Sequence, residues 1–214
     1  MTRLGVLVSG RGSNLSAIVE AQRAGRLGAE VGLVISNRPG AGGLEIAAAN
    51  QVPTCLLEHG AYPSRSAFDR ALVDALVAAR IDLVALAGFD RLVTRTLLDA
   101  FPVRILNVHP ALLPAFTGLH AQRQAIEYGV RVAGATVHYV DDQVDHGPIV
   151  LQGAVAVQPN DDEAALAARI LEVEHAIFPA AIRLHAEGRL EVHGRHVRIR
   201  GSVPPPPPAL LWIA

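Results

Sequence analysis

The sequence predicts an α/β protein with a mostly parallel, twisted sheet, helices on both of its faces and an antiparallel edge in the C-terminal half. In the first half, short and uniformly apolar runs alternate with amphipathic helical patterns, which is typical of parallel strands covered on both faces. In the second half, apolar and polar residues alternate more within a strand, and a short loop joins two such strands, which favours antiparallel pairing. Of the 214 residues, 50% are hydrophobic, so the chain can bury one sizeable core.

Five strands are predicted in the first half of the chain. They cover residues 4–8, 31–35, 52–57, 83–87 and 105–108. The helical spacing of apolar side chains predicts helices between them, over residues 15–25, 44–49, 66–79 and 95–100. Thr94 precedes the last of these helices and is expected to cap it. The lone cysteine, Cys55, lies in the third strand and is interpreted as a buried, small hydrophobic side chain.

The second half is predicted to begin with a helix over residues 121–128. Its strands are expected over residues 135–140, 149–157, 190–192 and 197–199. The first two of these strands are expected to pair antiparallel, and the last two to form a hairpin. The polyproline run 204–208 and the residues after it indicate a mobile or surface-packed tail, with a docking motif as the alternative.

One long helix is predicted between the antiparallel strands and the hairpin. Asn160 and Glu163 have the spacing of a capping box at its start. Its buried stripe is predicted at Leu166, Ile170, Val173 and Ile177. Pro179 lacks a backbone N–H group, so it is expected to end or kink the helix.

Composition excludes several classes of function. All 19 basic residues are Arg, so the chain cannot form a Schiff base through lysine or a phosphate loop that requires lysine. The formal net charge of −1 argues against nucleic acid or a membrane surface as a partner. The chain has no run of about 18 apolar residues that could span a membrane. One cysteine cannot form an intrachain disulfide or a cysteine-based zinc site. Because no signal-peptide pattern opens the sequence, we expect a cytoplasmic protein.

The first loop has the layout of a phosphate-binding loop. Residues 9–14, Ser-Gly-Arg-Gly-Ser-Asn, end a strand and open a helix, where glycines and helix N–H groups can accommodate an anion. Leu15 leaves the dinucleotide fingerprint incomplete, and Asn37 and Arg38 stand where its acidic residue belongs. A phosphate monoester therefore fits better than a dinucleotide. A plain turn capped by Ser13 is the alternative.

Asn107 and His109 end the fifth strand, at the edge of the sheet where open α/β proteins bind ligands. One residue separates them, so their side chains share one face of an extended strand. An amide donor beside an imidazole can stabilise a developing oxyanion. In the alternative interpretation, His109 only packs and bonds to the backbone.

An acidic turn follows the strand over residues 135–140 and contains Asp141, Asp142 and Asp145. A carboxylate beside His109 would fix the tautomer of its ring and raise its pKa. A divalent-cation site and a solvated turn are the alternatives, but the spacing is not that of a calcium-binding loop. The spacing of His120 and His138 matches no common metal signature, so no metal is expected, and His138 is predicted to face inward.

Eight short motifs follow one another along the chain. They begin at Gly10, Leu86, Asn107, Leu112, Gly118, Gly134, Asp145 and Glu174. In one-letter code they are GRGSNL, LAGF, NVHP, LLP, GLH, GATVHYV, DHGPI and EHAIFP. Their order and spacing resemble the phosphoribosylglycinamide formyltransferases, which are folate-dependent enzymes of purine synthesis. The resemblance runs from Leu4 to about Ile199.

The resemblance implies a Rossmann-like formyltransferase fold in a single domain over residues 1–200. Residues 1–108 would form its nucleotide- and phosphate-binding half, residues 109–200 its folate-binding and closing half, and residues 201–214 a Pro-rich tail. The implied reaction moves the formyl group of 10-formyltetrahydrofolate to the amine of phosphoribosylglycinamide. These small molecules would be its partners, without metal, nucleic acid or membrane, in a monomer or homodimer.

The resemblance also implies a role for each matched residue. His109 would be the catalytic acid, Asn107 the donor to the oxyanion, and Asp145 the group that raises the pKa of His109. The residues implied for phosphoribosylglycinamide are Gly12, Ser13, Asn14 and Glu174. The residues implied for the folate are Arg65, Asp90, Arg91, Leu92, Val93, Asn107, Val140, Asp141 and Asp142.

Two positions depart from the family pattern. Asp90 stands where the family usually has an apolar residue, and we expect it to pair with Arg91 or Arg95 or to alter the fit of the substrate. Thr117 stands where a proline usually precedes the Gly-Leu-His motif.

Three other functions remain open from the sequence. Formyltetrahydrofolate deformylase resembles the same centre, but its family carries an N-terminal regulatory domain that we do not expect here. Methionyl-tRNA formyltransferase would need an RNA-binding domain and a basic surface. A nucleotide-binding module without catalysis is the third alternative, because a fold alone does not fix a function.

Overall fold

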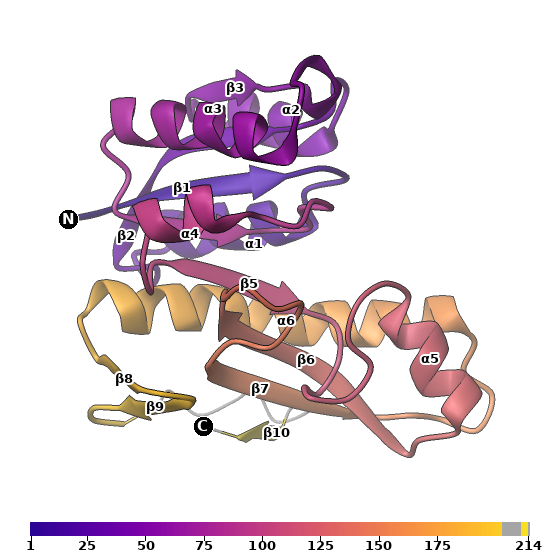
Figure 1. Cartoon of the computed structure of the whole chain (residues 1–214). Coiled ribbons are helices and arrows are strands. Elements are labelled where there is room, and N and C mark those ends of the chain that lie inside the picture. Colours follow the sequence, from indigo (N-terminus) through magenta and orange to yellow (C-terminus); the bar gives the residue numbers. More distant parts are fainter. Residues whose placement is uncertain (203–210, 214) are drawn as a thin grey trace. The chain divides into compact units, whose positions relative to one another are not determined.

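The computed structural model describes residues 1–202 and 211–213 of the chain (Figure 1). It divides into two compact units, Met1–Asn107 and Val108–Ala214, which are described in turn. The strand that crosses the boundary is β5 (Ile105–His109). Two of the candidate catalytic residues, Asn107 and His109, lie on this strand.

The first unit holds a parallel arrangement of strands. Its strands are β1 (Thr2–Val8), β2 (Ala29–Ser36), β3 (Thr54–Leu56), β4 (Leu83–Leu86) and the start of β5. Its helices are α1 (Ser13–Arg23), α2 (Gly42–Ala49), the short 3₁₀ helix η1 (His59–Ala61), α3 (Arg65–Ala78) and α4 (Arg95–Ala100). The strand order is β3-β2-β1-β4-β5, and each neighbouring pair is parallel. The predicted parallel sheet is confirmed, and Thr94 caps α4 as expected, accepting a hydrogen bond from the backbone N–H of Thr96.

Helices cover both faces of these strands. Gly5 and Val8 are three positions apart on β1, so they face opposite sides of the sheet. A Cβ atom at Gly5 would lie 2.6 Å from Cδ2 of Leu76 in α3. A Cβ atom at Gly43 of α2 would lie 2.8 Å from Cγ2 of Val8. Helices α3 and α2 therefore pack closely on opposite faces, as the sequence predicts.

The third strand is shorter and more exposed than predicted. The expectation was a strand over residues 52–57, whereas β3 covers Thr54–Leu56. It ends the order of strands and pairs with β2 alone, so one of its edges is unpaired within the described residues. Cys55 is consequently half-buried, and its interpretation as a buried side chain is wrong. An apolar run does not distinguish an edge strand from a central one.

The second unit is built on antiparallel strands. Its strands are β6 (Val132–Tyr139), β7 (Ile149–Ala156), β8 (Leu190–His193), β9 (His196–Ile199) and β10 (Leu211–Ile213). Its helices are α5 (Ala121–Tyr128) and α6 (Glu163–Ala186). The predicted antiparallel pairs β6–β7 and β8–β9 are confirmed. Strand β10 pairs antiparallel with β7 and is not predicted by the sequence, while the polyproline run 204–208 lies outside the described residues.

Helix α6 lies along β6 and β7 in Figure 1 and buries the predicted stripe. Leu166, Ile170, Val173 and Ile177 are all fully buried. Gly153 of β7 allows the close approach, because a Cβ atom there would lie 2.3 Å from Cγ1 of Val173.

Pro179 does not end α6, which continues to Ala186, so that alternative is wrong. Phe178 and Ile182 are fully buried on either side, and their packing offsets the hydrogen bond that proline removes. No helix in residues 1–202 and 211–213 is long and apolar enough to cross a bilayer.

The start of α6 is capped by Asp162 rather than by the predicted pair. Oδ1 of Asp162 accepts a hydrogen bond of 2.7 Å from the N–H of Ala165. Glu163, expected in a capping box with Asn160, bonds to Arg123 at 2.9 Å instead. Several oxygen-bearing side chains precede this helix, and spacing alone selected the wrong one.

We expect Asp162→Ala to lower the free energy of unfolding by about 1 kcal/mol, because the N–H of Ala165 loses its acceptor. Urea denaturation measures the change. Asn160→Ala is the matched control and should change stability by less than about 0.5 kcal/mol. A larger loss in the control than in Asp162→Ala would restore the predicted capping box.

Candidate active site

The loop between β1 and α1 is shaped by glycine. Gly12 has a φ of +81° and is the N-cap of α1. A Cβ atom at Gly12 would lie 2.6 Å from Cα of Gly43, and the carbonyl of Gly10 accepts a hydrogen bond of 3.2 Å from the N–H of Gly43. The loop therefore rests on the start of α2, at a distance that only glycine permits.

Ser13 is the first residue of α1, so its predicted role as N-cap is wrong. The Gly12 position has no side chain to cap the helix, and the first-turn N–H groups have no carbonyl of their own helix to bond to. Asn14 is 7% exposed, and Ser13 is half-buried. These N–H groups and the positive end of the helix can hold a phosphate.

His109 lies buried at the end of β5, with 5% of its surface exposed. Its Nε2 is 2.9 Å from the carbonyl oxygen of Phe116, and its Nδ1 is 3.3 Å from Oδ2 of Asp145. A carbonyl and a carboxylate both accept hydrogen bonds. Each ring nitrogen of His109 therefore faces an oxygen atom that can accept a hydrogen bond from it. The predicted proximity of Asp145 to His109 is present in the structure.

Asp145 is held in place by the backbone around it. Its own φ is +50°, in the left-handed region. Its Oδ2 accepts a hydrogen bond of 2.8 Å from the N–H of Gly118. The turn is tight at Gly147, where a Cβ atom would lie 1.8 Å from the carbonyl oxygen of Tyr139. The carboxylate is thereby fixed next to His109, with 12% of its side chain exposed.

A second histidine, His138, faces the same carboxylate, and sequence reasoning did not assign it to the site. Its Nε2 is 3.8 Å from Oδ1 of Asp145, and its Nδ1 donates a hydrogen bond of 2.8 Å to the carbonyl of Tyr139. The predicted inward orientation is confirmed, since His138 is 2% exposed. Burial lowers the pKa of His138, and the hydrogen bond to Tyr139 and the charge of Asp145 offset part of this effect. The only signal in the sequence is a histidine on the strand that leads into the acidic turn.

Burial lowers the pKa of His138 in the folded protein below 6.5, its value in the unfolded chain. Below pH 6.5, the unfolded chain therefore binds a proton at His138 more readily than the folded protein does. Its contribution to stability is therefore present above pH 6.5 and lost as the pH falls. We expect the free energy of unfolding to drop between pH 7.5 and 5.5, and to drop by less in His138→Asn, with a difference of about 1 kcal/mol. Urea denaturation at both pH values measures it. Equal slopes for the two proteins would contradict the assignment.

Asp141, at the start of the acidic turn, bonds within the second unit. Oδ2 of Asp141 is 2.8 Å from Nδ1 of His146, and Arg195 of the hairpin β8–β9 lies 2.8 Å from Nε2 of the same ring. Asp142 is exposed, and Val140 is half-buried. Asp141 is therefore more than a solvated charge, because it orders the turn that also carries Asp145.

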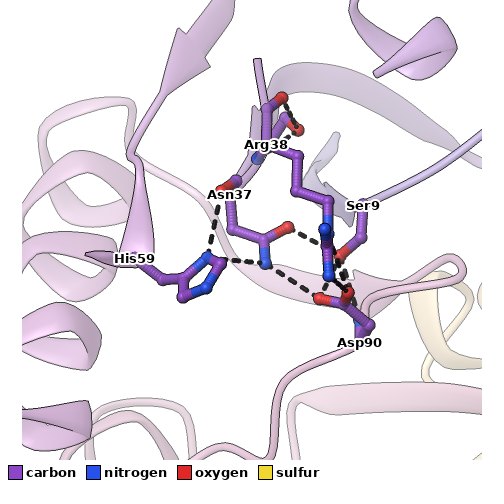
Figure 2. Close-up of polar contacts among 6 residues, drawn as sticks. Ser9, Asn37, Arg38, His59 and Asp90 are labelled. Atoms are coloured by element: carbon purple, nitrogen blue, oxygen red, sulfur yellow. Dashed lines mark hydrogen bonds and ion pairs between the residues drawn. The ribbon is translucent and has the colours of Figure 1, made fainter. Parts of the chain in front are cut away.

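Asp90, in the first unit, binds side chains that the sequence did not connect with it. Figure 2 shows its carboxylate bound by Arg38, Asn37 and Ser9. Its cationic partner is Arg38, so the expected pairing with Arg91 or Arg95 is wrong. Arg38 follows β2 and is 52 positions from Asp90, a separation that no local pattern reveals.

The other candidate residues lie as follows. Arg65 opens α3 and is exposed, Arg91 and Val93 are half-buried, and Leu92 is 54% exposed. Asn107 is half-buried on β5, and Glu174 is 7% exposed on α6. His120 is an exposed residue at the start of α5. Among the described residues, no group of three or more His, Cys, Asp and Glu side chains could hold a metal ion.

The chain matches a known protein family in sequence and in structure. Residues 2–182 match the family model described as formyl transferase. The phosphoribosylglycinamide formyltransferase of Escherichia coli K12 is 41% identical over 201 residues, which cover 94% of this chain and 95% of that protein. A trifunctional purine biosynthetic protein of Drosophila pseudoobscura pseudoobscura is 46% identical over 190 residues, which are 88% of this chain and only 14% of that protein. The crystal structure of glycinamide ribonucleotide transformylase 1 from Symbiobacterium toebii superposes with a TM-score of 0.92 at 56% identity, covering 93% of this chain and 94% of that one.

Proposed function

The chain belongs to the formyl transferase family, and from this premise we propose that it transfers the formyl group of 10-formyltetrahydrofolate to the amine of 5-phosphoribosylglycinamide in purine biosynthesis. The products are 5-phosphoribosyl-N-formylglycinamide and tetrahydrofolate. The relatives from Escherichia coli and Symbiobacterium toebii support the proposal, because the likeness extends over nearly the whole length of both. The observation that carries it is the buried pair of His109 and Asp145 at the end of β5, in which the carboxylate lies 3.3 Å from Nδ1 of the imidazole.

In the proposed mechanism, the amine nitrogen of the glycinamide attacks the formyl carbon, and negative charge develops on the formyl oxygen. The side-chain amide of Asn107 and Nε2–H of His109 donate hydrogen bonds to that oxygen, which takes the place of the Phe116 carbonyl. The bond between the formyl carbon and the folate nitrogen then breaks. The attacking amine loses a proton and the leaving nitrogen gains one, through His109 or water. No metal and no covalent intermediate with the protein is needed.

Asp145 acts through His109. Its carboxylate stabilises the positive ring at 3.3 Å from Nδ1 and fixes the orientation of the ring. The N–H of Gly118 holds the carboxylate in that position. A charged donor in a site with little water stabilises an oxyanion more than a neutral donor does.

The substrates are assigned to the residues that the family resemblance implies. For phosphoribosylglycinamide these are Gly12, Ser13 and Asn14, which hold the phosphate, and Glu174, which contacts the ribose or the glycinamide. For the folate they are Arg65, Arg91, Leu92, Val93, Asn107, Val140, Asp141 and Asp142, together with the segment around Asp90. The start of α1 has glycine as its N-cap and no capping side chain, which supports the phosphate assignment. Small molecules in the cytoplasm are the proposed partners.

A turnover assay tests the proposal. The purified protein is mixed with 10-formyltetrahydrofolate, with and without phosphoribosylglycinamide, and both tetrahydrofolate and the formylated ribonucleotide are followed. We expect both products only when the ribonucleotide is present. Release of tetrahydrofolate and formate without it would identify a deformylase instead. Binding of the ribonucleotide without turnover would leave a non-catalytic nucleotide-binding module.

A further inference from the structure

Three loop segments of the first unit meet in a polar cluster of Ser9, Asn37, Arg38 and Asp90, which we call the Asp90 cluster (Figure 2). Ser9 follows β1, Asn37 and Arg38 follow β2, and Asp90 comes shortly after β4. In the sheet, β1 lies between β2 and β4, and all three run parallel. The cluster therefore joins the carboxyl ends of three neighbouring strands, with the phosphate loop starting from the middle one.

Protein donors occupy both oxygens of the Asp90 carboxylate. Oδ1 accepts a hydrogen bond of 2.9 Å from Nδ2 of Asn37 and lies 2.9 Å from Oγ of Ser9. Oδ2 accepts from Nε of Arg38 at 2.8 Å and from Nη2 at 2.5 Å. The backbone N–H of Asp90 donates to Oγ of Ser9 at 2.9 Å. A carboxylate has about four acceptor sites, so these contacts leave it little capacity to bind a substrate.

The cluster is buried on one side and charged on the other. Asn37 is 1% exposed and Ser9 is 9% exposed, whereas the side chains of Asp90 and Arg38 are 35% and 55% exposed. Burial alone would raise the pKa of Asp90, but hydrogen bonds from Asn37, Arg38 and Ser9 and the charge of Arg38 hold it below its ordinary value. The carboxylate is therefore negative at neutral pH, with Arg38 as its counter-charge.

The same contacts fix the start of the phosphate loop. Ser9 immediately precedes Gly10, and its backbone N–H donates to the carbonyl of Gly88 at 3.1 Å. On the other side of the loop, the N–H of Gly43 donates to the carbonyl of Gly10. The loop is thus held between the Asp90 cluster and the start of α2, and Ser9 connects the cluster directly to Gly10.

We propose that Asp90 is a positioning residue for phosphate binding: its carboxylate contacts no substrate, and it sets the conformation in which residues 10–14 bind the phosphate of the ribonucleotide. The inference rests on the proposed function and deepens it. It assigns a role to the acidic residue that replaces the usual apolar one. Arg38 is its partner in this role.

If Asp90 and Arg38 acted on the phosphate only through their charges, the predicted effect of changing Asp90 would have the opposite sign. If the charges alone mattered to a bound phosphate, removing the carboxylate would leave Arg38 unbalanced and strengthen phosphate binding, while removing the guanidinium would weaken it. If positioning matters, removing either partner disturbs Ser9 and weakens binding. The sign of the Asp90→Asn effect therefore separates the two.

The experiment measures the affinity for ribose 5-phosphate by calorimetry in the wild type, Asp90→Asn, Arg38→Gln and the double variant. We expect the Kd to rise about tenfold in each single variant. The Kd of the double variant should not exceed that of the single variant that binds more weakly, because both changes break the same contact. Glu187→Gln is the matched control, since it removes one partner of another exposed ion pair, with Arg183, and should leave the Kd unchanged. Circular dichroism checks that each variant is folded. Tighter binding in Asp90→Asn, or an unchanged Kd in both single variants, overturns the proposal.

Turnover of the same variants separates this inference from the proposed function. Positioning predicts a higher KM for phosphoribosylglycinamide with kcat within about threefold of the wild type, since binding is altered and the chemical step is not. If the wild type binds ribose 5-phosphate and forms no formylated product, the proposed function alone fails. If the wild type does not bind ribose 5-phosphate, the inference fails as well, because there is then no phosphate site to position.

Discussion

Replacing His109 by asparagine is expected to lower kcat by about a hundredfold to ten-thousandfold. Asparagine can still donate a neutral hydrogen bond near the former position of the ring, but it cannot carry a positive charge or pass on a proton. The loss should fall on kcat more than on KM, since the charge of the ring matters most when the formyl oxygen becomes negative. Steady-state turnover with both substrates varied measures the two constants.

Two controls protect the interpretation of His109→Asn. The change removes the nearer of the two histidines that face the largely buried carboxylate of Asp145, so thermal unfolding must show that the variant is folded at the assay temperature. His196→Asn makes the same replacement at an exposed position of β9 and should retain wild-type turnover. Retention of more than about a tenth of the activity in a folded His109→Asn protein would remove the proposed acid.

Asn107→Ala is expected to lower kcat by about a hundredfold to a thousandfold, because the oxyanion loses one of its two donors. Asn107→Asp is the sharper companion variant. It keeps the size of the side chain but replaces the donor by a negative charge, so it should be at least as slow as the alanine variant. The binding of ribose 5-phosphate, measured by calorimetry, should stay within about threefold of the wild type in both.

An equal loss of binding and turnover in both Asn107 variants would indicate damage to β5 rather than loss of a donor, since Asn107 also pairs with Leu86 of β4 in the sheet. Wild-type turnover in Asn107→Asp would exclude the amide as a donor to the oxyanion.

The sequence predicts the elements of this fold well because each has a local cause. The buried strands are continuous apolar runs, and α5 was predicted over residues 121–128, the range that it has in the structure. The predictions of local structure are wrong where contacts with residues distant in the sequence determine that structure. Gly12 rather than Ser13 caps α1, because Gly43 packs against the loop. Pro179 stays inside α6 because the side chains around it are buried.

In the candidate site too, the residues could be predicted from the sequence, whereas most contacts between them could not. His109 and Asp145 are 36 positions apart, and the order of family motifs, rather than any local pattern, suggested their contact. The second histidine on the carboxylate, His138, could be placed inward by its strand but not next to Asp145. The ion pair of Asp90 with Arg38 and the carbonyl of Phe116 on His109 have no signature in the sequence. The former joins two distant loops, and the latter is a backbone atom that any residue type could supply.

The carbonyl of Phe116 on Nε2 of His109 has a consequence for how binding energy is divided. In the proposed mechanism, a bound formyl oxygen exchanges one neutral carbonyl for another at the same N–H donor, so this hydrogen bond adds little to the affinity for the intact folate. The exchange becomes favourable only as the oxygen acquires negative charge, because a charged acceptor outcompetes the peptide carbonyl. The Phe116 carbonyl therefore competes with the formyl oxygen for the same donor. As a result, this hydrogen bond contributes almost no binding energy to the ground state and contributes mainly to the transition state. Unreactive folate analogues that keep a neutral carbonyl should therefore bind hardly better than those that lack it, whereas analogues with a tetrahedral, anionic oxygen should bind far more tightly.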